Sequence, residues 1–197
     1  MYSNIMSEAM EQLPRGRHKL SRDTVKASQR ERLLRAMLEL VAEQGYEATT
    51  VPQVVARARV SRNAFYDFFA DKVACFLALC DELADEMLEE IRVADLPPAE
   101  ALREGMRRYL RWWADRPAFA RTYLLELPTA GTPAVEQRRR QYARFEEIFA
   151  LLGADELQAR AITFMITELI TDEVREGRLA ALPDRADDFV ALVQRLL

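Results

Sequence analysis

The chain has 197 residues, half of them apolar, and only 6 Gly and 8 Pro, so long helices with short connections and a sizeable core are expected. No apolar run approaches the roughly 18 residues that a membrane-spanning helix needs, and the N-terminus lacks the apolar stretch of a signal peptide, so we expect no membrane segment and a cytoplasmic location. One histidine and two cysteines offer no ligand set for a metal, and nothing indicates a cofactor.

The net charge of −4 is unevenly distributed along the chain. Residues 1–72 hold twelve Lys/Arg and nine Asp/Glu, a balance of +3, whereas the remainder holds sixteen and twenty-three, a balance of −7. The N-terminal third is therefore the part suited to approach phosphates.

A basic arm over residues 1–23 is predicted ahead of the first helix, because the eight cations from Arg15 to Arg35 face only Asp23 and Glu31. Such an arm could enter a DNA minor groove or follow phosphates. A solvated, disordered tail fits the same composition, and both interpretations stay open.

A supporting helix is predicted from about residue 24 to Gly45. Its apolar positions recur at helical spacing, and Gly45 is placed to end it in a left-handed C-cap. The apolar positions are Leu33, Leu34, Met37, Leu38 and Val41.

Two short helices are predicted between residues 50 and 69. Thr50 and Gln53 form a capping box, so a helix begins near residue 51. About two turns later Ser61 offers a second N-cap, which predicts a tight turn and a helix over 62–69. That helix would bury Phe65, Phe68 and Phe69 and expose Arg62, Asn63, Ala64, Tyr66 and Asp67. Two helices joined so tightly indicate a helix-turn-helix.

The segment ARVSRNAFYDFFADK resembles the recognition helix of the tetracycline-repressor (TetR) family, through Ala58, Val60, Ser61, Phe65, Tyr66, Phe69 and Lys72. The turn glycine of the family is Arg59 here, and a non-glycine in a left-handed turn costs about 1 kcal/mol. Asn63 and Ala64 also depart from the family pattern. The resemblance implies an all-α fold, with a three-helix helix-turn-helix DNA-binding domain over 24–70 and a helical ligand-binding and dimerisation domain over 71–197.

Six further helices complete a set of about nine. Apolar spacing, prolines and glycines place them at about 71–93, 99–114, from 117 to before Pro128, 132–153, 155–176 and 184–196.

Aromatic residues gather in the middle of the second domain. The resemblance implies a ligand cavity there, since such sites are mostly apolar with a few orienting polar atoms. Simple core filling is the alternative for each ring, and a buried or interface ion pair is the alternative for Glu168. The predicted cavity residues are Trp112, Trp113, Phe119, Tyr123, Phe145, Phe149, Phe164 and Glu168.

The helix predicted at 155–176 is apolar over more than one face and needs cover on two sides. The resemblance implies a homodimer built from this helix and the last one, although burial within one chain is the alternative. The predicted interface residues are Ala161, Met165, Ile166, Leu169, Phe189, Val190 and Val193.

These features predict a ligand-responsive transcription regulator, most often a repressor by family resemblance. It would bind an inverted repeat in double-stranded DNA as a homodimer and be released by a small, largely apolar or amphipathic effector. Arg62 and Asn63 would reach base edges and Ala64 a thymine methyl group. Phosphate contacts are expected from Thr50, Ser61, Tyr66 and Lys72.

The competing hypothesis is a helical ligand- or protein-binding module that keeps the fold without reading DNA. Arg59 in the turn and Asp67 on the exposed face favour it. An enzyme is not expected, because the sequence shows no phosphate loop and no nucleophile–base motif.

Overall fold

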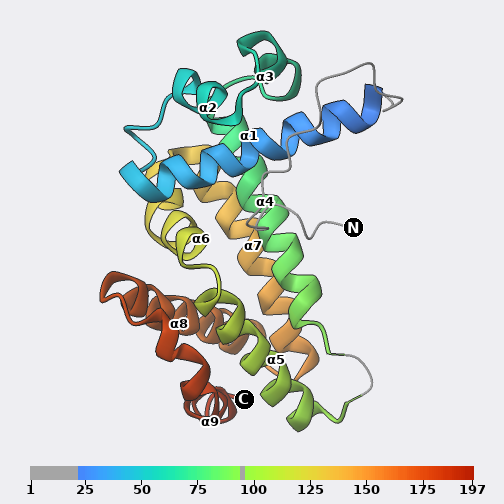
Figure 1. Cartoon of the computed structure of the whole chain (residues 1–197). Helices are drawn as coiled ribbons and strands as arrows, with labels where there is room; N and C mark the ends of the chain where they lie inside the picture. Colours follow the sequence, from blue (N-terminus) through green and yellow to red (C-terminus); the bar gives the residue numbers. More distant parts are fainter. Residues whose placement is uncertain (1–21, 94–95) are drawn as a thin grey trace. The chain divides into compact units, whose positions relative to one another are not determined.

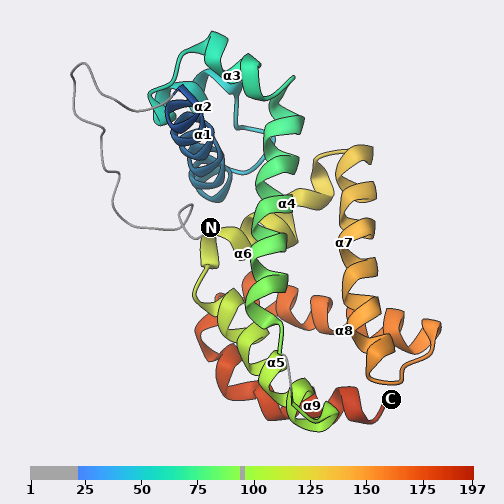
Figure 2. The same ribbon diagram turned by 90° about the vertical axis from the view of Figure 1, so that its right-hand side faces the viewer.

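The computed structural model describes residues 22–93 and 96–197, so the predicted basic arm lies almost entirely outside the described residues. Within those ranges the chain forms nine α-helices and no strand (Figure 1, and Figure 2 from the side). The predicted all-α fold is confirmed. None of the described helices is long and apolar enough to cross a membrane.

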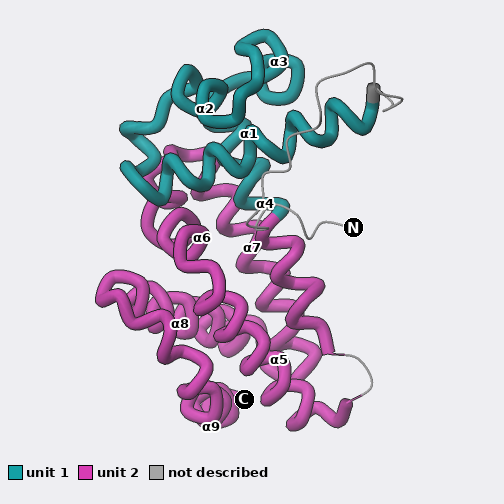
Figure 3. Tube along the Cα trace, in the orientation of Figure 1, with its two compact units in different colours: residues 1–82 teal, residues 83–197 magenta. Residues whose placement is uncertain are grey.

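The chain divides into two compact units, residues 1–82 and 83–197 (Figure 3). The boundary between these compact units falls inside α4 (Lys72–Ile91). The reason is that the first half of α4 contributes Phe76, Leu79 and both cysteines to the core of the first unit. The ring of Phe76 lies 4.6 Å from that of Tyr46, which follows the first helix.

The first unit contains α1 (Arg22–Gln44), α2 (Val51–Ala58) and α3 (Arg62–Phe68). Each of these helices packs against the other two. They bury the apolar spacing predicted from the sequence, including Leu34 and Met37 on α1, Val54 on α2 and Phe65 on α3. The helix bounds fall within about two residues of the predicted ones, because the signals that set them are local caps and glycines.

The second unit contains the rest of α4 and the helices α5 (Pro98–Ala114), α6 (Pro117–Arg121), α7 (Thr132–Leu151), α8 (Glu156–Arg175) and α9 (Ala186–Gln194). α7 packs on α8, and α5 packs on α9. A 3₁₀ segment, Leu179–Arg185, precedes α9 and packs on both α5 and α8.

The sixth helix is shorter than the sequence predicts. α6 ends at Arg121, and the chain continues as a π-helical turn, Thr122–Glu126, and a 3₁₀ turn, Leu127–Thr129. Pro128 has no backbone N–H to donate to a preceding carbonyl, so regular α-helix cannot continue through it.

Candidate functional site

Local hydrogen bonds fix the starts of α2 and α3. Ser61 Oγ accepts a hydrogen bond from the backbone N–H of Ala64 at 3.1 Å, as predicted for an N-cap. At the start of α2, Gln53 Oε1 accepts from the Thr50 backbone N–H at 2.8 Å. Only three residues separate α2 from α3. This spacing and these caps are those of a helix-turn-helix.

The exposed face of α3 carries the predicted contact residues. Arg62, Asn63 and Tyr66 are exposed, while Ala64 is half-buried. Phe65, between them in sequence, is fully buried and anchors the helix to the core of the first unit. The Arg62 guanidinium lies 5.7 Å from the centre of the Tyr66 ring. The face therefore presents a cation, an amide and a phenol together, all able to bond to nucleic acid.

Lys72 occupies a different position from the other predicted phosphate contacts. Its Nζ donates to the backbone carbonyl of Tyr46 at 3.0 Å and lies 4.1 Å from the centre of the Tyr46 ring. Burial lowers the pKa of this amine. The side chain ties the start of α4 to the loop after α1, so its first role in this structure is internal.

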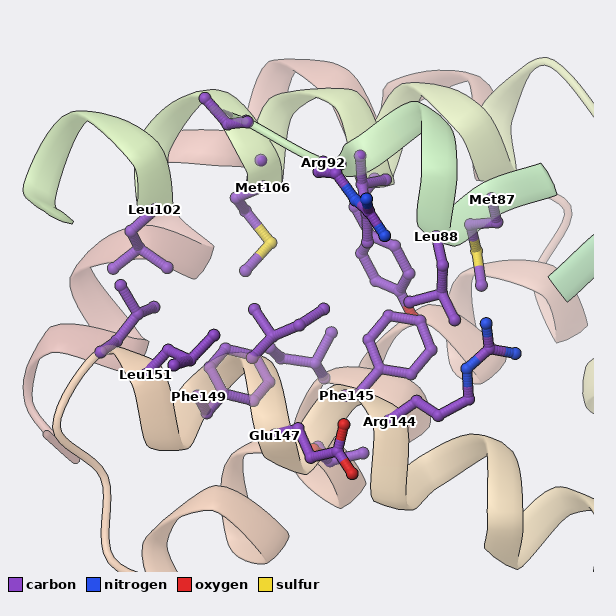
Figure 4. A pocket seen from close by; sticks show the side chains of 18 of the residues that line it. Met87, Leu88, Arg92, Leu102, Met106, Arg144, Phe145, Glu147, Phe149 and Leu151 are labelled. Atoms are coloured by element: carbon purple, nitrogen blue, oxygen red, sulfur yellow. The ribbon is translucent and has the colours of Figure 1, made fainter. Parts of the chain in front are cut away.

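A cavity of about 620 Å³ lies within the second unit (Figure 4). Its walls come from the second half of α4, from α5, α7 and α8, and from the π-helical turn Thr122–Glu126. Apolar side chains such as Leu88, Met106 and Phe149 make up most of the lining. The volume is in the range of pockets that hold small organic molecules.

Most polar atoms in these walls already have partners. The Tyr123 hydroxyl donates to Gln141 Oε1 at 2.5 Å, and Arg138 Nε donates to the Tyr142 hydroxyl at 2.7 Å. The hydroxyls of Thr163 and Thr167 donate to backbone carbonyls of their own helix at 2.9 and 2.8 Å. Because these groups are satisfied, the cavity offers a ligand mainly carbon surface.

Charged side chains occur among the lining residues as well. Figure 4 shows Arg92, Arg144 and Glu147 beside the apolar groups. Arg92 is paired with Glu89 at 3.1 Å, and Arg144 is paired with Asp85. A molecule with a long apolar part and a polar end would match this mixture.

Four of the predicted cavity residues line the cavity: Trp113, Tyr123, Phe145 and Phe149. Both adjacent tryptophans were predicted to line the cavity, and only Trp113 does so. Residues missed by the sequence interpretation include Met106 and Tyr109, which share a face of α5 with Trp113 at spacings of three and four. That periodicity was visible in the sequence and would have identified them.

The other four predicted cavity residues lie elsewhere. Trp112 and Phe119 are fully buried behind the wall, with ring centres 5.3 Å apart. Phe164 is 51% exposed on the outer face of α8, against the ring of Tyr142. Glu168 is exposed and forms an ion pair with Arg175 at 2.9 Å. The alternative for Glu168 was a buried or interface ion pair, and the pair observed here is exposed. The face of α8 to which Phe164 and Glu168 belong points away from the cavity.

Of the seven predicted dimer residues, four are buried and three are at least partly exposed. Phe189, Val190 and Val193 are buried on α9, which packs on α5, and Ile166 is buried on α8, where it lines the cavity. Met165 and Leu169 are half-buried, and Ala161 is exposed. The outward apolar stripe of α8 consists of Leu157, Ala161, Phe164 and Met165, with Leu157 76% exposed.

Residues 33–79 match the family model described as "Bacterial regulatory proteins, tetR family". Among curated proteins, the chain is 26% identical over 102 residues to the uncharacterized HTH-type transcriptional regulator YerO of Bacillus subtilis, covering 49% of this chain and 35% of YerO. It is 24% identical over 182 residues to the HTH-type transcriptional activator FasR of Mycolicibacterium smegmatis, covering 88% of this chain and 83% of FasR. The chain thus spans about a third of YerO but most of FasR.

Among solved structures, the chain is similar to the transcriptional regulator FadR from Bacillus subtilis in complex with stearoyl-CoA. The TM-score is 0.71 at 20% identity, covering 82% of this chain and 96% of FadR. At this identity the similarity establishes a shared fold.

Proposed function

We propose that this chain, which belongs to the tetR family of bacterial regulatory proteins, binds an inverted repeat in double-stranded DNA as a homodimer and releases it when an effector fills its cavity. The observation that carries the proposal is the exposed face of α3, held in place by the Ser61 cap and the buried Phe65. This face lies within the stretch that matches the family model.

The roles on α3 follow from side-chain chemistry. Arg62 would pair with the O6 and N7 atoms of guanine, and Asn63 with N6 and N7 of adenine. Ala64 would touch a thymine methyl group, while Thr50, Ser61 and Tyr66 would bond to phosphates. A two-fold dimer would place one α3 in each of two half-sites about one helical turn apart, which is why an inverted repeat is expected.

The effector is proposed to be an amphipathic molecule with a long apolar part. The satisfied polar groups of the wall and the cavity of about 620 Å³ support this class. The similarity to FadR, whose structure holds stearoyl-CoA, supports acyl thioesters as first compounds to try.

Repression is the proposed sign of regulation, since a protein released by its effector relieves a block on transcription. The alignment with FasR, named a transcriptional activator, favours activation as a second candidate. Transcription in vitro from a promoter carrying the bound site separates the two: repression predicts less transcript on adding protein, and activation predicts more.

The proposal is tested by selecting bound fragments from a random DNA pool with purified protein, then adding stearoyl-CoA to the recovered complex. The expected result is an inverted repeat whose binding weakens as stearoyl-CoA is added. Arg62→Ala should relax the preference at one base position and cost about 1–3 kcal/mol of binding free energy. Recovery of no common sequence, before or after unfolding and refolding to remove a retained ligand, would favour the non-DNA-binding module instead.

A further inference from the structure

Arg59 has a backbone conformation that an arginine adopts only at a cost. It is the C-cap of α2, with φ 52° and ψ 46°, and its N–H donates to the carbonyl of Ala56 at 3.2 Å. Among the described residues it is the one non-glycine with a positive φ. A Cβ atom is disfavoured in this left-handed region, whereas glycine is accommodated there freely. Strain of this kind is commonly kept where it serves function.

A second arginine reaches the same turn from α1. Arg32 Nη1 donates to the carbonyl of Ala58 at 3.1 Å and to that of Arg59 at 3.4 Å. These bonds fix the Arg32 guanidinium at the C-terminal end of α2, where a positive charge is favoured. The exposed side chain of Arg59 therefore leaves the backbone beside an anchored cation, and exposed Arg62 follows three residues later.

The turn differs in its ion pairing from the rest of the first unit. Three other arginines of the unit are neutralised: Arg30 by Glu82, Arg35 by Glu31 at 3.4 Å, and Arg57 by Glu43 at 2.8 Å. By contrast, the described part of the chain places no carboxylate within ion-pair distance of the three arginines at the turn. These are Arg32, Arg59 and Arg62. Among the described residues of the unit, these three arginines thus keep an uncompensated positive charge, and Arg62 is the first residue of α3.

We propose that Arg59, supported by Arg32, binds a backbone phosphate of double-stranded DNA beside the start of α3. The inference rests on the proposed DNA-binding function and adds a contact at a position where the family pattern has glycine. A guanidinium can donate two parallel hydrogen bonds to a phosphate, and its charge releases a condensed counterion. Phosphate contacts position a protein without reading sequence, so Arg59 acts on affinity and on salt dependence but not on base preference.

The test compares the full-length protein with Arg59→Gly on a short mixed-sequence DNA duplex, between about 50 and 200 mM salt. The slope of log affinity against log salt should become shallower by about 1 for the variant. The same substitution removes the left-handed strain, so its thermal unfolding midpoint should rise by about 2–4 °C. A gain in stability with a loss of DNA affinity cannot arise from damage to the fold.

Two matched variants complete the test. Arg57→Ala removes an arginine two positions away that Glu39 and Glu43 already neutralise, so its salt slope should equal that of the wild type. Arg59→Lys keeps the charge and should keep most of the wild type's dependence of affinity on salt.

If the wild type binds the duplex and Arg59→Gly shows the same salt slope, the phosphate contact is overturned and the proposed function stands. If the wild type does not bind duplex DNA, both the phosphate contact and the proposed DNA-binding function are overturned. A lower unfolding midpoint in Arg59→Gly would assign the residue a structural role and also overturn the inference.

Discussion

Glu173 is the only charged side chain that is buried among the residues that the structure describes. It lies in the last turn of α8, where the helix dipole disfavours a negative charge. Two arginines offset this unfavourable interaction with the dipole. Arg178 Nε lies 2.9 Å from one carboxylate oxygen of Glu173, and Arg185 Nη1 lies 2.7 Å from the other. Both arginines belong to the segment that leads from α8 to α9. The carboxylate therefore holds the corner that positions the last helix.

Glu173→Gln should lower the free energy of unfolding by about 1–3 kcal/mol. Removing one partner of a buried pair costs about 3–5 kcal/mol, but both arginines are roughly half exposed and regain water, which reduces the loss. Urea unfolding measures the change. The control is Glu168→Gln on the same helix, because Glu168 is also paired with an arginine but is exposed, so its effect should stay within about 0.5 kcal/mol. Equal losses in the two variants would show that burial of Glu173 does not matter.

At the scale of whole helices, the sequence predicts where elements begin and end better than which side they present. Thr50 and Ser61 start α2 and α3 as predicted, because caps act on neighbouring backbone groups. The orientation of α8 depends on distant partners. Ile166 and Phe164 are two residues apart and similarly apolar, yet one is buried and the other exposed. A helix that is apolar nearly all round gives no internal signal to distinguish them.

The exposed stripe of α8 is the surface that we propose for the homodimer interface. Phe164→Glu places a charge at the centre of this stripe and should convert the proposed dimer to a monomer, since an unpaired charge in an apolar interface is costly. Sedimentation velocity measures the change in mass, and binding to an inverted repeat should weaken with it. Val135→Glu is the control, because Val135 is 56% exposed on α7 and is not part of the stripe. A dimer that persists in Phe164→Glu would exclude this face as the interface.

At the scale of the molecule, α4 is the element that contributes to both units. Two arginines attach its second half to the walls of the cavity. Arg116, at the corner between α5 and α6, pairs with Glu86 at 3.0 Å and with Glu90 at 3.3 Å. Arg144, on α7, pairs with Asp85. A ligand that separates the walls would therefore act on α4, and the same helix continues into the unit that carries α3.

The tryptophan pair extends this connection to the cavity itself. Trp113 lines the cavity and its ring centre lies 5.2 Å from that of Trp112. The Arg116 guanidinium in turn lies 4.6 Å from the Trp112 ring. These packed contacts form a continuous physical route from the cavity to α4. Coupling between two sites is a free energy, and it must be equal in both directions.

Arg116→Ala should reduce that coupling while leaving each binding site intact. In the wild type, saturating stearoyl-CoA should weaken DNA binding, and DNA should weaken stearoyl-CoA binding by the same factor, typically about 5–150-fold. In Arg116→Ala the two factors should fall together toward one, because α4 is no longer tied to the corner next to Trp112. The affinities for DNA alone and for stearoyl-CoA alone should change little.

Arg103→Ala, which removes an exposed arginine on the α9 side of α5, should retain the wild-type factor. Fluorescence anisotropy with labelled DNA, with and without stearoyl-CoA, gives one direction, and calorimetric titration of stearoyl-CoA with and without DNA gives the other. An unchanged factor in Arg116→Ala would show that α4 responds to the cavity through other contacts, with Arg144 the next residue to replace.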